Sequence, residues 1–147
     1  MDIIKMLVEE GGAKINEVSS YGVTPLIAAA AAGNTEATQY LIAHGADVTA
    51  KDDLGKTALL HAAAKNNKAL ITNLIKLNSA ATELADITGN TPLMYAAQAG
   101  ALGNVQALVA NGANVNYKNP NNGLNALAVA AAEGQNATVR YLVRNGA

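Results

Sequence analysis

The chain has 147 residues and a formal net charge of −1, so it has the size of about one domain and no overall field that would attract nucleic acid or an anionic membrane. Half of the residues are hydrophobic, but only 3% are aromatic and 32 are alanine, which favours a core of closely packed helices. The absence of cysteine excludes disulfide bonds, thiolate catalysis and cysteine-ligated zinc.

An internal repeat runs along the chain. Four copies of a phrase similar to Gly-x-Thr-Pro-Leu begin at Gly22, Gly55, Gly89 and Gly123, which are 33, 34 and 34 residues apart. A second phrase, rich in Leu and Val or Ile and ending near Gly-Ala, keeps the same period, and an unpaired copy of it lies at 7–11. Periods of this length are typical of stacked repeats. We therefore predict a single domain, 1–147, with a half repeat at 1–18 and full repeats at 19–51, 52–85, 86–119 and 120–147.

Each full repeat is expected to contain a short first helix, a turn, a second helix and a loop. The first helix follows an N-cap residue, such as Thr24 or Thr91, and has proline at its first position in two repeats. The second helix carries apolar residues at helical spacing on one face. Each first helix is expected to end at a residue that tolerates the left-handed conformation: Gly33, Asn66, Gly100 and Gly134.

The loops between repeats are not all of one length. One extra residue follows Asn78 and another follows Gly112, in the region of the Asn-Pro-Asn-Asn segment at 119–122. We expect each loop to form a hairpin, here called a finger. The two insertions predict longer fingers at those two junctions.

These phrases resemble the ankyrin-repeat motif over nearly the whole chain. The aspartate that opens the motif is Asp52 and Asp86 in the middle repeats and is replaced by Ser19 and Pro120 in the outer ones. The motif's alanine pair is present in every repeat, at 29–30, 62–63, 96–97 and 130–131. The resemblance implies an all-α fold, an α-solenoid of stacked helix-turn-helix units with hairpin loops.

The sequence departs from the motif at its histidine. That position holds apolar residues, which predicts packing by shape where the family usually builds a polar network between repeats. In having apolar residues at this position, the motif is similar to that of bacterial members of the family. The four replacements are Ile27, Leu60, Met94 and Ala128.

Candidate catalytic groups are few, and a structural role explains each of them. His44 falls at the end of a second helix, where the helix dipole favours a cation. His61 and Tyr95 hold equivalent places in neighbouring first helices, so stacking is expected to bring the tyrosine hydroxyl near the imidazole. A proton-transfer pair is the catalytic alternative. With no phosphate-binding loop or metal-ligand spacing visible, we predict that the chain is not an enzyme and has no cofactor or metal.

Binding to nucleic acid or to a membrane is not expected. Five lysines are concentrated around the second full repeat, either as an ordinary solvated face or as a band for an acidic protein surface. The longest run of low polarity, 25–33, is about half the roughly 20 residues needed to span a bilayer. No leader segment is visible after Met1, so a cytoplasmic location is expected; a periplasmic or secreted location is the alternative if a signal was removed. The lysines are Lys51, Lys56, Lys65, Lys68 and Lys76.

The resemblance also implies where a partner would bind, because ankyrin-like proteins use a concave face formed by the fingers and first helices. We predict a non-enzymatic scaffold, a monomer, that binds a partner protein there; the alternative is a segment of a larger protein that docks in cis. Four residues near the finger tips would either form an exposed apolar stripe or pack finger against finger: Tyr21, Leu54, Ile87 and Leu124. The predicted partner-binding residues are Tyr21, Val23, Asp53, Leu54, Lys56, Lys65, Ile87, Asn90, Gln98, Asn122, Leu124 and Glu133.

Overall fold

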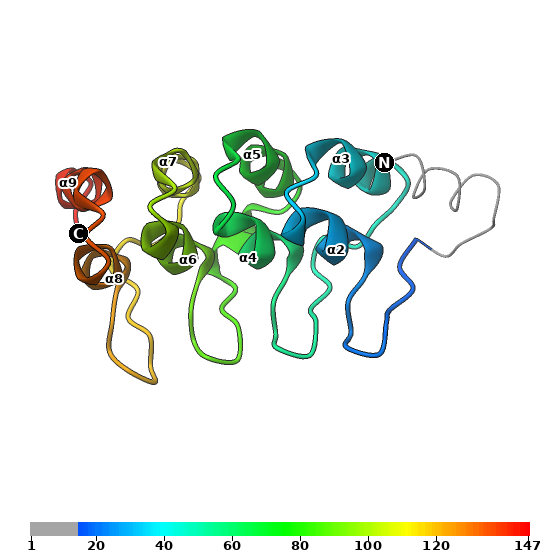
Figure 1. The fold of residues 1–147 in the computed structure, drawn as a ribbon, viewed down its shortest axis with the longest axis horizontal. Coiled ribbons are helices and arrows are strands. Elements are labelled where there is room, and N and C mark those ends of the chain that lie inside the picture. The colour runs from blue at the N-terminus through cyan, green and yellow to red at the C-terminus, as the bar shows by residue number, and fades with distance from the viewer. Residues whose placement is uncertain (1–14) are drawn as a thin grey trace.

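The computed structural model describes residues 15–147, which form helices, turns and loops and contain no strand. The phrase at 7–11 and most of the predicted half repeat lie outside these residues. The first helices and second helices form two parallel rows, with the fingers projecting beyond the first row (Figure 1). The helices of the first row are α2 (Pro25–Ala31), α4 (Ala58–Ala63), α6 (Pro92–Ala99) and α8 (Ala126–Ala132). Those of the second row are α3 (Thr35–Ala43), α5 (Lys68–Leu77), α7 (Leu102–Ala110) and α9 (Asn136–Arg144).

Each first helix begins at a side-chain cap, as predicted. Thr24 Oγ1 accepts a hydrogen bond from the backbone N–H of Ile27 at 3.1 Å, and Thr57 and Thr91 do the same for the residue three positions on. Asn125 replaces the threonine in the last repeat and accepts from the Ala128 N–H at 2.8 Å. These bonds satisfy a helical N–H that has no partner within the helix.

The predicted helix ends are confirmed at the glycines and wrong at Asn66. Gly33, Gly100 and Gly134 have φ values of 71°, 68° and 70°. No residue other than glycine has a positive φ within residues 15–147, and α4 ends at Ala63 with Ala64 in a right-handed conformation. The physical reason is the Cβ of Asn66, which makes the left-handed conformation costly when a tighter right-handed turn can end the helix instead.

The extra residue after Asn78 does not lengthen a finger. It is absorbed by a 3-10 helix, η1 (Ser79–Glu83), which follows α5. The finger that comes next closes by a bond from the Asp86 N–H to the Asn90 carbonyl, with the same spacing as the bond from the Asp52 N–H to the Lys56 carbonyl. The prediction of a longer finger at this junction is therefore wrong.

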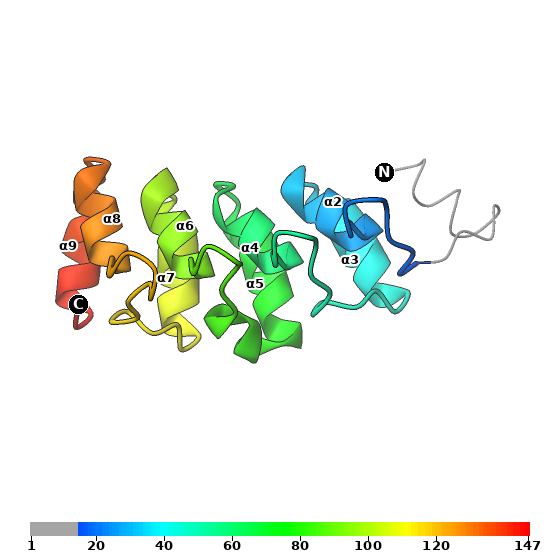
Figure 2. The same cartoon turned by 90° about the horizontal axis from the view of Figure 1, so that it is seen from below.

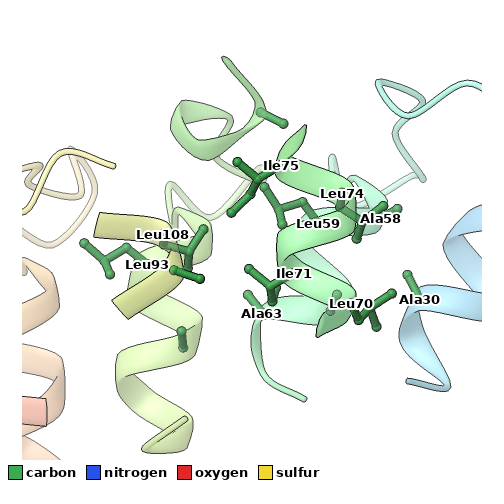
Figure 3. Packing of buried hydrophobic residues seen from close by; sticks show 14 of the residues in the cluster. Ala30, Ala58, Leu59, Ala63, Leu70, Ile71, Leu74, Ile75, Leu93 and Leu108 are labelled. Carbon is green, nitrogen blue, oxygen red and sulfur yellow. The ribbon is translucent and has the colours of Figure 1, made fainter. Parts of the chain in front are cut away.

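The core lies between the two rows and continues from repeat to repeat (Figure 3). Ala30, Ala63 and Ala97 have no exposed surface, so first helices approach one another through methyl groups. Leucines from the second row fill the space behind them. The expected apolar packing at the motif's histidine position is confirmed in three repeats: Ile27, Leu60 and Met94 are 1–3% exposed.

Polar links between repeats were not predicted. Asn67 donates from Nδ2 to the Gly33 carbonyl at 3.3 Å, and Asn104 donates to the Ala63 carbonyl at 2.9 Å and to the Lys65 carbonyl. Gln135 donates to the Gln98 carbonyl at 3.2 Å. Each amide therefore caps the end of the first helix in the preceding repeat.

Candidate protein-binding face

The twelve predicted contact residues lie on the fingers, on the first helices and in the turns that follow those helices, and none is buried. Val23, Lys56 and Asn90 are half-buried, and the other nine are exposed. We call this surface the finger face; Figure 2 shows it with the fingers toward the viewer. Tyr21, Leu54, Ile87 and Leu124 are 74%, 53%, 65% and 43% exposed, which favours the stripe over packing of finger against finger.

Backbone hydrogen bonds join the first three fingers. The Asp53 N–H donates to the Tyr21 carbonyl, and the Ile87 N–H donates to the Leu54 carbonyl, each at 3.0 Å. Neighbouring tips are thus held together without the use of their side chains. The side chains of Tyr21, Leu54 and Ile87 remain available to a partner.

The junction between the third and fourth fingers is made differently. Pro120 occupies the equivalent donor position and has no N–H. The side-chain amides of Asn119 and Asn121 replace it, and each donates to the Thr88 carbonyl at 2.9 Å. In the sequence, a proline between two asparagines indicates that side-chain amides replace the backbone donor at this junction.

The structure also corrects the assignment of Pro120 as the residue that opens the last motif. The Asn119 N–H donates to the Leu124 carbonyl at 2.8 Å, which is the bond made by the opening aspartates in the middle repeats. Asn119 is 1% exposed and takes the aspartate's place. The extra residue therefore lies within this finger, and the longer finger predicted after Gly112 is confirmed.

Asp52 and Asp86 tie their fingers to the first helix of the same repeat. Asp52 Oδ1 accepts from the backbone N–H groups of Leu54 and Lys56 at 3.0 and 2.9 Å. Its Oδ2 lies 2.7 Å from His61 Nε2. Asp86 binds its own turn in the same way, and its Oδ2 accepts a hydrogen bond from the Tyr95 hydroxyl.

The Tyr95 hydroxyl was expected to lie near His61, but its hydrogen bond is made to a different group. Each ring is directed to the aspartate of its own repeat, and no hydrogen bond joins the two within residues 15–147. His44 stacks on Tyr40 with ring centroids 4.1 Å apart, and its Nδ1 lies 2.8 Å from the Tyr40 carbonyl oxygen. These contacts tie each of the three side chains to its own repeat.

Hydrogen bonding decides the ionisation of the two aspartates. Burial raises the pKa of Asp86, but hydrogen bonds from Thr88, Tyr95 and nearby backbone groups outweigh this effect, so the pKa lies below its ordinary value. Burial likewise raises the pKa of Asp52, and hydrogen bonds from His61 and from the backbone lower it further than burial raises it. Both carboxylates are therefore ionised at neutral pH, and their oxygens already accept hydrogen bonds within the repeat.

The cluster of lysines divides into two groups. Lys56 is half-buried, and its Nζ lies 4.9 Å from the centre of the Tyr95 ring, a cation–π distance. The other four lysines are exposed: Lys51, Lys65, Lys68 and Lys76. Among the described residues, no three His, Asp or Glu side chains are grouped so that they could hold a metal ion.

One relation that sequence analysis missed links the start of a finger to the middle of its first helix. Where the opening residue is Asp52 or Asp86, the helix offers His61 or Tyr95 to bind it. In the outer repeats the opening residues are Ser19 and Asn119, and the helix positions hold Ala28 and Val129. This matched change of two positions was visible in the sequence once the repeats were aligned.

Within residues 15–147, no helix has the length and apolar character required to cross a membrane.

Comparison with known proteins agrees with the repeat architecture. A family model described as ankyrin repeats (3 copies) matches residues 1–81 and again 59–147. The chain is 32% identical over 145 residues to the ankyrin repeat and KH domain-containing protein mask-1 of Caenorhabditis elegans, an alignment that covers 99% of this chain and 5% of that protein. It is 46% identical over 80 residues to delta-latroinsectotoxin-Lt1a of Latrodectus tredecimguttatus, covering 53% of this chain and 6% of the toxin.

A third relative is a transient receptor potential cation channel subfamily A member 1 homolog of Caenorhabditis elegans. It is 32% identical over 141 residues, which are 95% of this chain and 11% of the channel. The chain thus spans about a tenth or less of the length of these relatives. The matched family model and the four stacked helix pairs lead to one conclusion: the chain belongs to the ankyrin-repeat family.

Proposed function

We propose that this chain is a non-enzymatic, monomeric scaffold that binds a partner protein along the finger face, in the cytoplasm. Ankyrin repeats generally mediate protein–protein interaction, and the family is generally non-enzymatic. The observation that supports this surface is the exposure of Tyr21, Leu54 and Ile87 on finger tips that are joined through backbone atoms. A row of exposed apolar side chains on finger tips held in fixed positions contributes nothing to the core, but it offers apolar contact area to a partner protein.

A second candidate is a segment of a larger protein that docks in cis. Its support is the small share of each relative that the chain covers, from 5% to 11%. The same finger face would then bind another part of the same gene product. Identification of the bound protein separates the two candidates, because only docking in cis predicts that the partner carries this chain's own flanking sequence.

The test is capture from a lysate of the source organism, followed by mass spectrometry. We expect the wild type to retain a protein that is lost with Tyr21→Ala, Leu54→Glu or Ile87→Glu, because each change removes apolar contact area from the stripe. Leu77→Glu is the matched control, since Leu77 is 53% exposed, as is Leu54, but lies at the end of α5 in the second row. Retention of the same protein by all three stripe variants would assign binding to another surface.

A further inference from the structure

The finger face contains a pocket of about 190 Å³ between the third and fourth repeats. Its apolar lining comes from Met94 of α6, Val129 of α8 and Leu124 of the last finger. Three primary amides also line it: Asn90, Gln98 and Asn122. The pocket combines apolar surface with a few polar groups, as small recognition sites do.

The hollow exists because the link between finger and helix is missing in the last repeat. Tyr95 occupies the equivalent position one repeat earlier and reaches the aspartate of its own finger. Val129 is too short to do so, and the side chain of Asn119 is turned toward the third finger, where Nδ2 lies 2.8 Å from Asn90 Oδ1. The space taken by a side chain in the preceding repeat is therefore open here.

The charges around the pocket favour a neutral occupant. No lysine, arginine, aspartate, glutamate or histidine lines it. Tyr95, which also lines the pocket, contacts one charge of each sign, because its hydroxyl donates to Asp86 and its ring lies under Lys56. A charged side chain entering the pocket would lose hydration without gaining a counter-charge.

Size and hydrogen-bond capacity favour an aromatic ring with a hydroxyl group. A cavity of about 150 Å³ is large enough to hold benzene. The thioether of Met94 is a good contact for such a ring. Within the described residues, the Gln98 side chain and the Asn122 Nδ2 group make no hydrogen bond, so both have donors for a phenolic oxygen.

We propose that this pocket receives a tyrosine side chain from an extended segment of the partner protein. The proposal rests on the proposed function, since it names the residue type that the finger face recognises. Tyrosine meets all three requirements, because its ring supplies apolar area and its hydroxyl supplies a polar end without a charge. Leu124 lines the pocket and is also exposed, so it would contact both the tyrosine ring and the residues that flank it.

The test is an NMR titration of the full chain with N-acetyl-tyrosinamide, N-acetyl-phenylalaninamide and N-acetyl-argininamide. We expect the tyrosine amide to shift the side-chain signals of Met94, Gln98 and Asn122, with a Kd of roughly 1 mM, as is reasonable for so small a ligand. The phenylalanine amide should bind several-fold more weakly, and the arginine amide should cause no shifts at this site.

Variants keep the test specific to the pocket. Val129→Tyr places a ring where the ligand would bind and should weaken the tyrosine amide at least tenfold. Ala28→Tyr, at the equivalent exposed position of α2, is the control and should leave binding unchanged. Far-UV circular dichroism and the melting temperature confirm that both variants fold.

The outcomes separate this proposal from the proposed function. Equal or tighter binding of the phenylalanine or arginine amide, or shifts that persist in Val129→Tyr, would overturn the tyrosine pocket. An absence of shifts with the tyrosine amide would overturn it as well. Capture that depends on Leu54 and Ile87 would still support the finger face, because neither residue lines the pocket.

Discussion

Asp86 shows how one carboxylate holds a finger in shape. Its two oxygens accept hydrogen bonds from the turn of its own finger and from the Tyr95 hydroxyl of α6. The side chain therefore joins two elements that packing alone would leave free to move apart. Because these bonds favour the ionised form, they lower the pKa of Asp86 in spite of burial and make the stability of the repeat depend on pH.

Asp86→Asn should reveal that dependence. A folded-state pKa below the unfolded value stabilises the protein above the unfolded pKa, and this contribution is lost as the pH falls through the folded pKa. We expect the variant to lose about 1–3 kcal/mol of unfolding free energy at pH 7, and the difference from the wild type to shrink in strongly acidic solution. Urea unfolding at pH 7, 4 and 2.5 measures this.

Asp53→Asn is the matched control for that experiment, because Asp53 is the exposed neighbour of the other finger aspartate. It should unfold as the wild type does at all three pH values. A constant gap between Asp86→Asn and the wild type across the series would show that the hydrogen bonds of Asp86 are independent of its charge.

The finger turn is the element in which backbone conformation and contacts between repeats meet. Gly89 has a φ of 85°, and a Cβ there would lie 2.5 Å from Asn119 Oδ1. Asn119 is buried and joins the third and fourth fingers, so it has no room to withdraw. A side chain at this glycine would disturb its own turn and the next repeat together.

Gly89→Ala and Gly123→Ala separate these two effects. Gly123 has a φ of 72°, but a Cβ there would meet nothing within 4 Å. Gly123→Ala should cost only the conformational strain, about 1–2 kcal/mol, whereas Gly89→Ala should add the loss of the Asn119 hydrogen bonds, about 1–3 kcal/mol more. Equal unfolding free energies for the two variants, measured in urea, would contradict this account.

Across the whole molecule, periodicity predicted more than the individual contacts did. The spacing of Gly22, Gly55, Gly89 and Gly123 was enough to predict four stacked helix pairs. The twelve contact residues are indeed accessible, but their role stays a prediction.

The repeat pattern did not predict the features that depend on pairs of residues far apart in the chain. The amide of Asn104 reaches a carbonyl 41 residues earlier, and Pro120 changes a junction through an N–H that it lacks. The pocket arises from the same kind of exception, since Val129 differs from Tyr95 at one position of an otherwise repeated pattern.

The alanine contacts between repeats predict a position effect. Ala97 has no exposed surface because the next helix pair covers it, whereas Ala131 holds the same place in α8 and is exposed. Ala97→Leu should therefore force helix pairs apart and cost about 1–3 kcal/mol, while Ala131→Leu should change the unfolding free energy by no more than about 0.5 kcal/mol. A large loss with Ala131→Leu would indicate that this face is also covered in solution.

The backbone bonds between neighbouring finger tips have a consequence for how this molecule could acquire new partners. Because Asp53 and Ile87 donate from main-chain nitrogens to main-chain oxygens, the distance between the first three tips does not depend on which side chains they carry. Side chains at these tips can be exchanged one at a time while the backbone spacing between the tips stays the same. The first three fingers are therefore the part to randomise when a library of binders is built on this scaffold, whereas the fourth, held by asparagine side chains, should be left unchanged.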